Sequence, residues 1–116
     1  MEYAIENEYL IVTVTTWGAQ VKSVVRKFDD VEHMWQADKS VWDYHAPILF
    51  PHTGKVVDDL IETKGEVYQA KQHGFARLME HTLVRQTEDT IVMELRSNEE
   101  TLRIFPYAFR LVSTFT

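Results

Sequence analysis

The feature that most constrains the fold is a two-residue alternation of apolar and polar side chains in short runs. Successive side chains of a strand point to opposite faces, so each run places its apolar residues on one face. The alternation recurs in residues 9–15, 19–26, 90–96 and 108–116. The sequence therefore predicts half-buried strands and hardly any helix.

Short polar or glycine-containing segments separate the runs and predict hairpin turns. They lie at residues 7–8, 29–30, 64–65 and 87–89. The further strands expected are residues 3–5, 31–35, 60–63, 66–70 and 81–86. About nine short strands at this spacing are typical of an all-β, antiparallel β-sandwich.

Two segments are exceptions, and we expect each to form a short helical turn. In residues 37–44, Asp38 is a suitable N-cap and Trp42 would anchor the turn in the core. In the second turn, Asn98 is the N-cap and Thr101 stands at the third helical position.

The final strand, residues 108–116, places Phe109, Leu111 and Phe115 on one face and has no turn after it. Such a strand needs neighbours over its apolar face and along its edges. We therefore expect a fold that is incomplete at the C-terminus and continues beyond Thr116. The alternative is a homo-oligomer in which another chain covers this strand.

Composition excludes several classes of protein. The net charge is −6 without a basic run of five, which argues against a nucleic-acid surface. No apolar run has the roughly 18 residues that span a bilayer. There is no cysteine, so disulfides and thiolate sites are excluded. The N-terminus lacks the pattern of a signal peptide, and a cytoplasmic location is expected.

Residues 72–77, which read Gln-His-Gly-Phe-Ala-Arg, carry the most distinctive chemistry. The His73 imidazole can donate, accept or carry a proton near neutral pH, and the Arg77 guanidinium is a fixed fork of donors. Gly74 permits an unusual backbone angle and a close approach by a ligand. Two interpretations remain open: a ligand-binding loop, or a buried histidine in a tight turn with Arg77 in solvent.

Other candidate groups are weaker. His52 could reach the same cleft as His73, or it could be a surface-loop histidine. No pair among His33, His45, His52, His73 and His81 has the spacing of a known metal motif, so no metal or other cofactor is expected. Glu99 and Glu100 are neighbours on a helical turn and do not face each other, which favours a solvated face over an acid–base pair.

Several short strings occur in an order that resembles the aldose 1-epimerase (galactose mutarotase-like) family. They are Pro-Ile-Leu-Phe-Pro at residues 47–51 with Gly54 shortly after, the string at residues 72–77, Glu-Glu-Thr at residues 99–101 and Phe-Pro-Tyr at residues 105–107. The similarity is strongest to the LacX-type and hexose-phosphate mutarotase-like branches. It covers residues 1–116 as the N-terminal portion of a single β-sandwich domain.

The resemblance implies a large β-sandwich, or supersandwich, in an isomerase that interconverts the α and β anomers of an aldose or aldose phosphate. A base takes the proton of the anomeric hydroxyl and an acid protonates the ring oxygen. In the family these are a glutamate and a histidine of the later part of the chain. The resemblance implies that His73 hydrogen-bonds the sugar near its ring oxygen. It also implies that Gln72 and Arg77 contact the substrate or shape its pocket.

Two departures leave the sugar undetermined. Many relatives have Gly-Arg where this chain has Gly54-Lys55, and galactose mutarotases place a sugar-contacting arginine near the position of Asp58 and Asp59. A lysine does not replace the arginine fork. Lys55, Lys71 and Arg77 are the cations available if the sugar is phosphorylated.

Two functional hypotheses follow. In the first, the chain supplies carbohydrate-binding residues to an aldose 1-epimerase but is inactive alone, because the family's acid and base are missing. In the second, it is a non-catalytic carbohydrate-binding or self-associating module. Trp17, Trp35 and Trp42 could stack on a sugar, although tryptophan more often serves the core, and core packing is expected.

Overall fold

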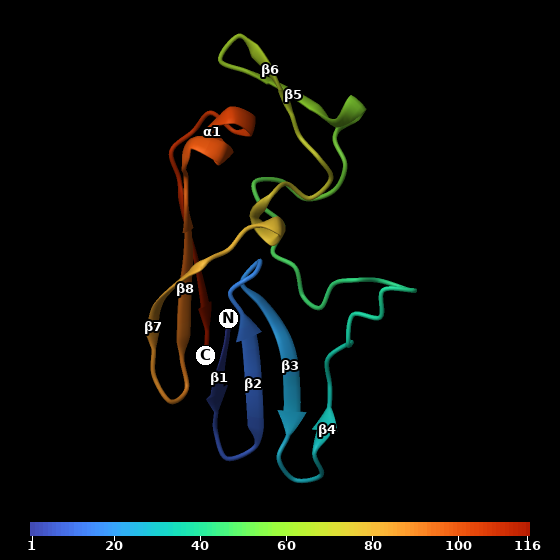
Figure 1. The fold of residues 1–116 in the computed structure, drawn as a ribbon, viewed down its shortest axis with the longest axis vertical. Coiled ribbons are helices and arrows are strands. Elements are labelled where there is room, and N and C mark those ends of the chain that lie inside the picture. The colour runs from blue at the N-terminus through green and yellow to red at the C-terminus, as the bar shows by residue number, and fades with distance from the viewer.

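Nine strands form three antiparallel sheets in the computed structural model, which describes residues 1–116 (Figure 1). The first sheet has the order β1-β2-β3-β4, built from β1 (Glu2–Glu6), β2 (Leu10–Thr15), β3 (Gln20–Arg26) and β4 (Val31–Glu32). The second is the hairpin of β5 (Leu60–Thr63) and β6 (Glu66–Gln69). The third has the order β7-β8-β9, built from β7 (Thr82–Gln86), β8 (Ile91–Arg96) and β9 (Arg110–Phe115). These elements confirm the strands and hairpins that the alternation predicts.

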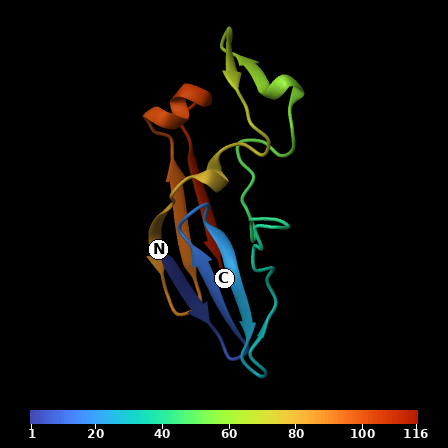
Figure 2. The same ribbon diagram turned by 45° about the vertical axis from the view of Figure 1, so that its right-hand side comes forward.

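The two larger sheets pack against each other and enclose the main core (Figures 1 and 2). Ile5, Val14 and Ala19 meet Ile91 and Met93 of β8, and all five side chains are between 0% and 6% exposed. Burying an aliphatic side chain of this size contributes about 1.5–3 kcal/mol. The structure is therefore an antiparallel β-sandwich, as expected.

A second cluster of aromatic rings joins the long connection before β5 to the third sheet. Phe50, Phe75, Phe105 and Phe109 contact one another with ring centroids between 5.0 and 6.2 Å apart. Leu95 of β8 closes the base of this cluster. The aromatic cluster fixes residues 50 and 75, which flank the candidate site.

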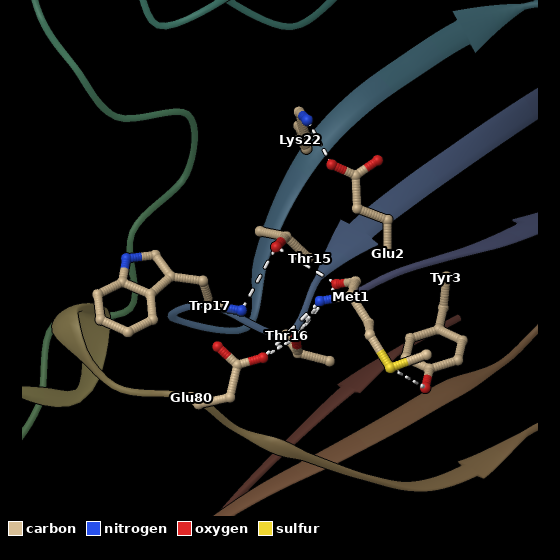
Figure 3. Close-up of polar contacts among 8 residues, drawn as sticks. All are labelled: Met1, Glu2, Tyr3, Thr15, Thr16, Trp17, Lys22 and Glu80. Carbon is tan, nitrogen blue, oxygen red and sulfur yellow. Dashed lines mark hydrogen bonds and ion pairs between the residues drawn. The ribbon is translucent and has the colours of Figure 1, made fainter.

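A polar junction ties the turn after β2 to the segment that leads into β7 (Figure 3). The Thr16 hydroxyl donates to the Glu80 carboxylate, and the Met1 ammonium donates to Thr16 Oγ1 at 2.8 Å. The Thr16 carbonyl accepts from the backbone N–H of His81 at 2.8 Å. These bonds hold the first sheet against residues 79–81.

Helices are short. They are the 3-10 helices η1 (Val57–Asp59) and η2 (Ala76–Leu78) and the α-helix α1 (Glu99–Ile104). The predicted N-cap is confirmed, because Asn98 Oδ1 accepts from Thr101 N at 3.0 Å. Thr101 Oγ1 also accepts from Asn98 N at 2.9 Å, which makes the pair a capping box. None of the helices has the length and apolar character required to cross a bilayer.

Residues 37–44 contain the single helical turn expected there. The Asp38 carboxylate accepts from Ser40 N at 2.9 Å, and the Asp38 carbonyl accepts from Val41 N at 2.9 Å and from Trp42 N at 2.8 Å.

Two other local predictions were wrong. Trp42 is half exposed rather than buried. The strand expected over residues 31–35 stops at Glu32. The Glu32 carboxylate accepts from Met34 N at 2.8 Å, which removes that backbone donor from strand pairing.

The last strand, β9, pairs with β8 alone and forms the edge of its sheet. Beside it lies an open hollow of about 550 Å³, whose apolar lining includes Val12, Val21, Val24 and Phe115. Only 15 of the 116 residues are buried, so a large part of both sheet surfaces remains accessible.

Candidate functional site

A backbone crossing between Phe50 and Gly74 sets the geometry of the site. Gly74 forms an isolated parallel bridge with Phe50, and the Phe50 carbonyl accepts from the N–H groups of Phe75 at 2.9 Å and Ala76 at 3.2 Å. Gly74 has a φ of +72°, and a Cβ atom there would lie 2.1 Å from the Phe50 carbonyl oxygen. Only glycine fits this crossing.

His73 is held by a reciprocal pair of hydrogen bonds with Gly54. Its backbone N–H donates to the Gly54 carbonyl at 3.0 Å, and its Nδ1 accepts from the Gly54 N–H at 2.9 Å. A neutral imidazole that accepts at Nδ1 carries its proton on Nε2. The Gly54 backbone thus fixes His73 as a hydrogen-bond donor through Nε2.

Gln72 lies beside this donor. Its side-chain amide is 3.4 Å from His73 Nε2. The atom in contact is the Gln72 amide nitrogen, which is itself a donor, so it does not accept the proton on His73 Nε2. The contact is long, which leaves the His73 donor accessible to a ligand.

Arg77 is positioned by contacts on two sides. Its Nη2 donates to the Gln72 carbonyl at 3.3 Å, and its guanidinium carbon lies 4.7 Å from the centroid of the Tyr44 ring. This distance is within the range of a cation–π interaction. The Nε atom is buried and has no partner, so one donor of the fork is left unsatisfied.

These three residues line one hollow of about 410 Å³. Its lining residues are Trp42, Pro47, Leu49, Gln72, His73 and Arg77. The structure thus brings together the three side chains that the sequence predicts for the site. The lining contains cationic and neutral donors and no carboxylate, so the hollow suits a ligand rich in oxygen acceptors.

His52 does not line this hollow. It lies in a separate cavity of about 230 Å³ on the Gly74 side of the segment, together with Lys71, Phe75 and Glu100. Of the two interpretations left open for His52, the one that places it in the cleft of His73 does not hold. The 72–77 segment separates the two cavities, because Gly74 lines one and its neighbour His73 the other.

The tryptophans correct another prediction. Trp17, Trp35 and Trp42 are 49%, 43% and 48% exposed, so none of them packs fully into the core. Trp42 lines the His73 hollow, so the interpretation that sequence reasoning placed second to core packing, a tryptophan able to meet a sugar, fits its position better. The signal that could have favoured this interpretation is the pair Trp42 and Tyr44, two large aromatic rings in a segment without strand or helix periodicity.

His81 fits the interpretation of a buried structural histidine. Its side chain is 2% exposed, and its Nε2–H donates to the Ala76 carbonyl at 2.9 Å. Burial lowers the pKa of His81 below its usual value, since the charged form loses its hydration.

The carboxylates lie outside the His73 hollow. Glu99 and Glu100 are exposed at the start of α1, which confirms the solvated face predicted for them. Glu94 pairs with Arg96 at 2.8 Å and with Arg110 at 2.6 Å, and these hydrogen bonds lower its pKa.

Comparison with known proteins places this geometry in a family. The family model described as aldose 1-epimerase matches residues 1–116. The plasmid-encoded protein LacX of Lactococcus lactis subsp. lactis is 34% identical over 121 residues, which cover 100% of this chain and 40% of that protein.

Solved structures give the same result. A galactose mutarotase related enzyme from Lactobacillus acidophilus is 38% identical with a TM-score of 0.97, over 98% of this chain and 38% of that one. A galactose mutarotase-like protein from Lactobacillus casei ATCC 334 is 34% identical with a TM-score of 0.94, over 98% of this chain and 39% of that one. The chain thus spans about 40% of the length of the curated relatives it matches. The match over residues 1–116 and the shared fold show that the chain belongs to the aldose 1-epimerase family.

Proposed function

We propose that this chain forms the sugar-binding wall of an isomerase that interconverts the α and β anomers of an aldose or aldose phosphate. One observation carries the proposal: Gln72, His73 and Arg77 line a single hollow with their donors held by backbone contacts, in a chain of the aldose 1-epimerase family. In this proposal residues 1–116 are the N-terminal portion of one β-sandwich domain.

The chemistry of anomer exchange gives each residue a role. The anomeric hydroxyl loses a proton, the ring oxygen gains one, and the ring opens and closes on the other face of C1. His73 Nε2–H donates to the ring oxygen and stabilises the negative charge that develops there, which is its catalytic role. The Arg77 fork binds hydroxyl or phosphate oxygens, and Gln72 completes the polar wall.

The proton-transferring acid and base come from outside residues 1–116. The absence of a carboxylate among the residues that line the hollow supports this part of the proposal. His73 is a poor candidate for a proton shuttle, because its Nδ1 already accepts from the Gly54 N–H and its Nε2 carries the proton. The chain by itself is then a binding unit without mutarotase activity.

Two measurements test this function. In titrations of the chain with D-glucose, D-galactose and their 6-phosphates, followed by backbone NMR, we expect shifts concentrated at residues 72–77. Polarimetry on freshly dissolved α-anomers should give the buffer rate. A protein-dependent rate that disappears in His73→Ala would contradict the proposal that the acid and base lie outside this chain. NMR spectra that do not change when sugar is added would contradict the binding site.

A non-catalytic, self-associating module is the second candidate. The observation that favours it is the unpaired edge of β9 beside the apolar hollow that includes Val12, Val24 and Phe115. A second copy that pairs along β9 would cover both. Sedimentation of the chain at micromolar concentration should then show dimers, whereas a monomer with a cooperative thermal melt would exclude this candidate.

A further inference from the structure

Trp42 is the one tryptophan that lines the hollow of His73 and Arg77, and about half of its surface is exposed. An exposed indole forgoes the favourable transfer of a large apolar surface out of water. The other walls at this point are Pro47 and Leu49, so an apolar surface faces the polar wall of Gln72, His73 and Arg77. The hollow therefore has an apolar side and a hydrogen-bonding side.

The backbone of Trp42 is fixed at both of its polar groups. Its N–H donates to the Asp38 carbonyl at 2.8 Å, and its carbonyl accepts from the indole Nε1–H of Trp35 at 2.8 Å. The residue lies in a segment without a helix or strand, and these bonds supply the order that regular structure would otherwise provide. Trp42 is thus held in place before any ligand binds.

An aromatic ledge, formed by Trp42 and Tyr44, connects this residue to the polar wall. The two ring centroids are 5.9 Å apart with an interplanar angle of 52°. Tyr44 in turn lies under the Arg77 guanidinium at 4.7 Å. Tyr44 therefore contacts both the Trp42 indole and the Arg77 guanidinium, which keeps these two groups close enough for a single ligand to contact both.

We propose that Trp42 is a specificity-determining residue that stacks on the C–H face of a pyranose whose oxygens are bound by His73 and Arg77. This inference rests on the proposed sugar-binding function. A pyranose carries hydroxyl and ring oxygens at its edge and C–H groups on its faces, which matches a site with one polar and one aromatic side. An open-chain polyol has the same hydroxyls but no fixed C–H face, and inorganic phosphate has neither.

The test compares Trp42 with Trp17. Trp17 is a matched control, because it has the same side chain and nearly the same exposure but lines a different hollow with Lys22 and His45. D-galactose and D-glucose would be titrated into the chain and its variants, with Kd taken from backbone NMR shifts. Sorbitol and inorganic phosphate serve as ligands that lack the stacking face.

We expect Trp42→Ala to weaken pyranose binding by about tenfold, Trp42→Phe by about two- to threefold, and Trp17→Ala by less than twofold. Trp42→Ala should leave the weaker binding of sorbitol and phosphate unchanged. A second readout uses the indole fluorescence of the Trp17→Phe variant, which keeps Trp35 and its hydrogen bond to Trp42, and in which Trp42 is the tryptophan that lines the hollow. Its fluorescence should change as the pyranose sites fill, and this readout needs no substitution at Trp42.

The outcomes separate the two proposals. If His73→Ala abolishes pyranose binding while Trp42→Ala binds as well as Trp17→Ala, the stacking inference is wrong and the proposed function stands. If Trp42→Ala weakens the binding of pyranose and of sorbitol by the same factor, Trp42 only supports the fold, and the inference is again overturned. If no pyranose shifts any resonance of the parent chain, the proposed function fails as well.

Discussion

His73 and His81 stand eight residues apart on the same connection, yet they occupy opposite environments. His73 lies in a left-handed turn with φ of +65°, and a backbone amide occupies its Nδ1 so that Nε2 serves the hollow. His81 is 2% exposed, and its Nε2–H is used by the Ala76 carbonyl. The side chain is the same in both, so the backbone around each residue decides whether it can meet a ligand.

The surroundings of the two histidines explain the difference. His81 enters the sandwich beside the polar junction of Thr16 and Glu80, where strand β7 begins. His73 lies on the segment that crosses Phe50, where the backbone is held by Gly54 and Gly74 rather than by a sheet. The sandwich buries the His81 imidazole, whereas the crossing segment leaves the His73 imidazole at the hollow.

The crossing itself offers the largest test. Gly74→Ala should lower the free energy of unfolding by about 3–5 kcal/mol, because the new Cβ clashes with the Phe50 carbonyl and φ is positive. Gly65→Ala is the matched control. Its φ is also positive, at +74°, but no atom lies within 4 Å of its Cβ position, so the cost should be about 1 kcal/mol. Urea denaturation of both variants gives the comparison, and equal costs would show that the crossing is not tightly packed.

Alanine substitution of the two histidines should separate stability from binding. His81→Ala removes a buried side chain and its hydrogen bond, so the free energy of unfolding should fall by about 2–3 kcal/mol. His73→Ala loses one hydrogen bond to Gly54 and should cost about 1 kcal/mol. Sugar affinity should fall in His73→Ala alone. A larger loss of unfolding free energy in His73→Ala than in His81→Ala would contradict this separation.

The pH dependence of stability should carry the signature of His81. Its pKa is lowered by burial, so the unfolded chain takes up the proton first. The stability is fully present above the unfolded pKa of about 6.5, and it falls by at most about 1.4 kcal/mol per pH unit as the pH drops from there toward the lowered folded pKa.

Urea midpoints between pH 5 and pH 8, about the range in which histidine titrates, measure this slope. His81→Gln keeps a side-chain donor for Ala76 but cannot titrate, and its slope should be flatter in the same window. The carboxyl groups of Glu32 and Glu94 have lowered pKa values, so their contribution is lost at more acidic pH. If the pH slope of His81→Gln equals that of the parent chain, the burial of His81 does not cause the pH dependence of stability.

Arg77→Lys should give the smallest effect. It keeps the positive charge but loses the planar fork that contacts Gln72 and Tyr44. We expect sugar affinity to fall by about fivefold and the melting temperature to stay nearly constant. Isothermal titration and thermal melts of the same samples test both parts. A large loss of stability would assign Arg77 to the fold rather than to the ligand.

Local and periodic features could be predicted from the sequence, and features that depend on distant segments could not. The alternation in β2, β3, β8 and β9 is written into consecutive residues, as is the capping box of α1. The single turn that Asp38 caps is equally local, because its carboxylate and carbonyl accept from residues two to four positions later. The hollow joins Trp42 to residues about 30 positions later without any shared period, and that union appears only in three dimensions.

The most direct test of the account is the imidazole nitrogen spectrum of His73 in the chain labelled with ¹⁵N, recorded with and without an aldose. We predict a proton on His73 Nε2 and none on Nδ1 in the free chain, and a shift of the Nε2 signal, together with that of Arg77 Nε, as the sugar binds. A proton on Nδ1, or sugar-dependent shifts at His52 and Lys71 with His73 unaffected, would contradict it.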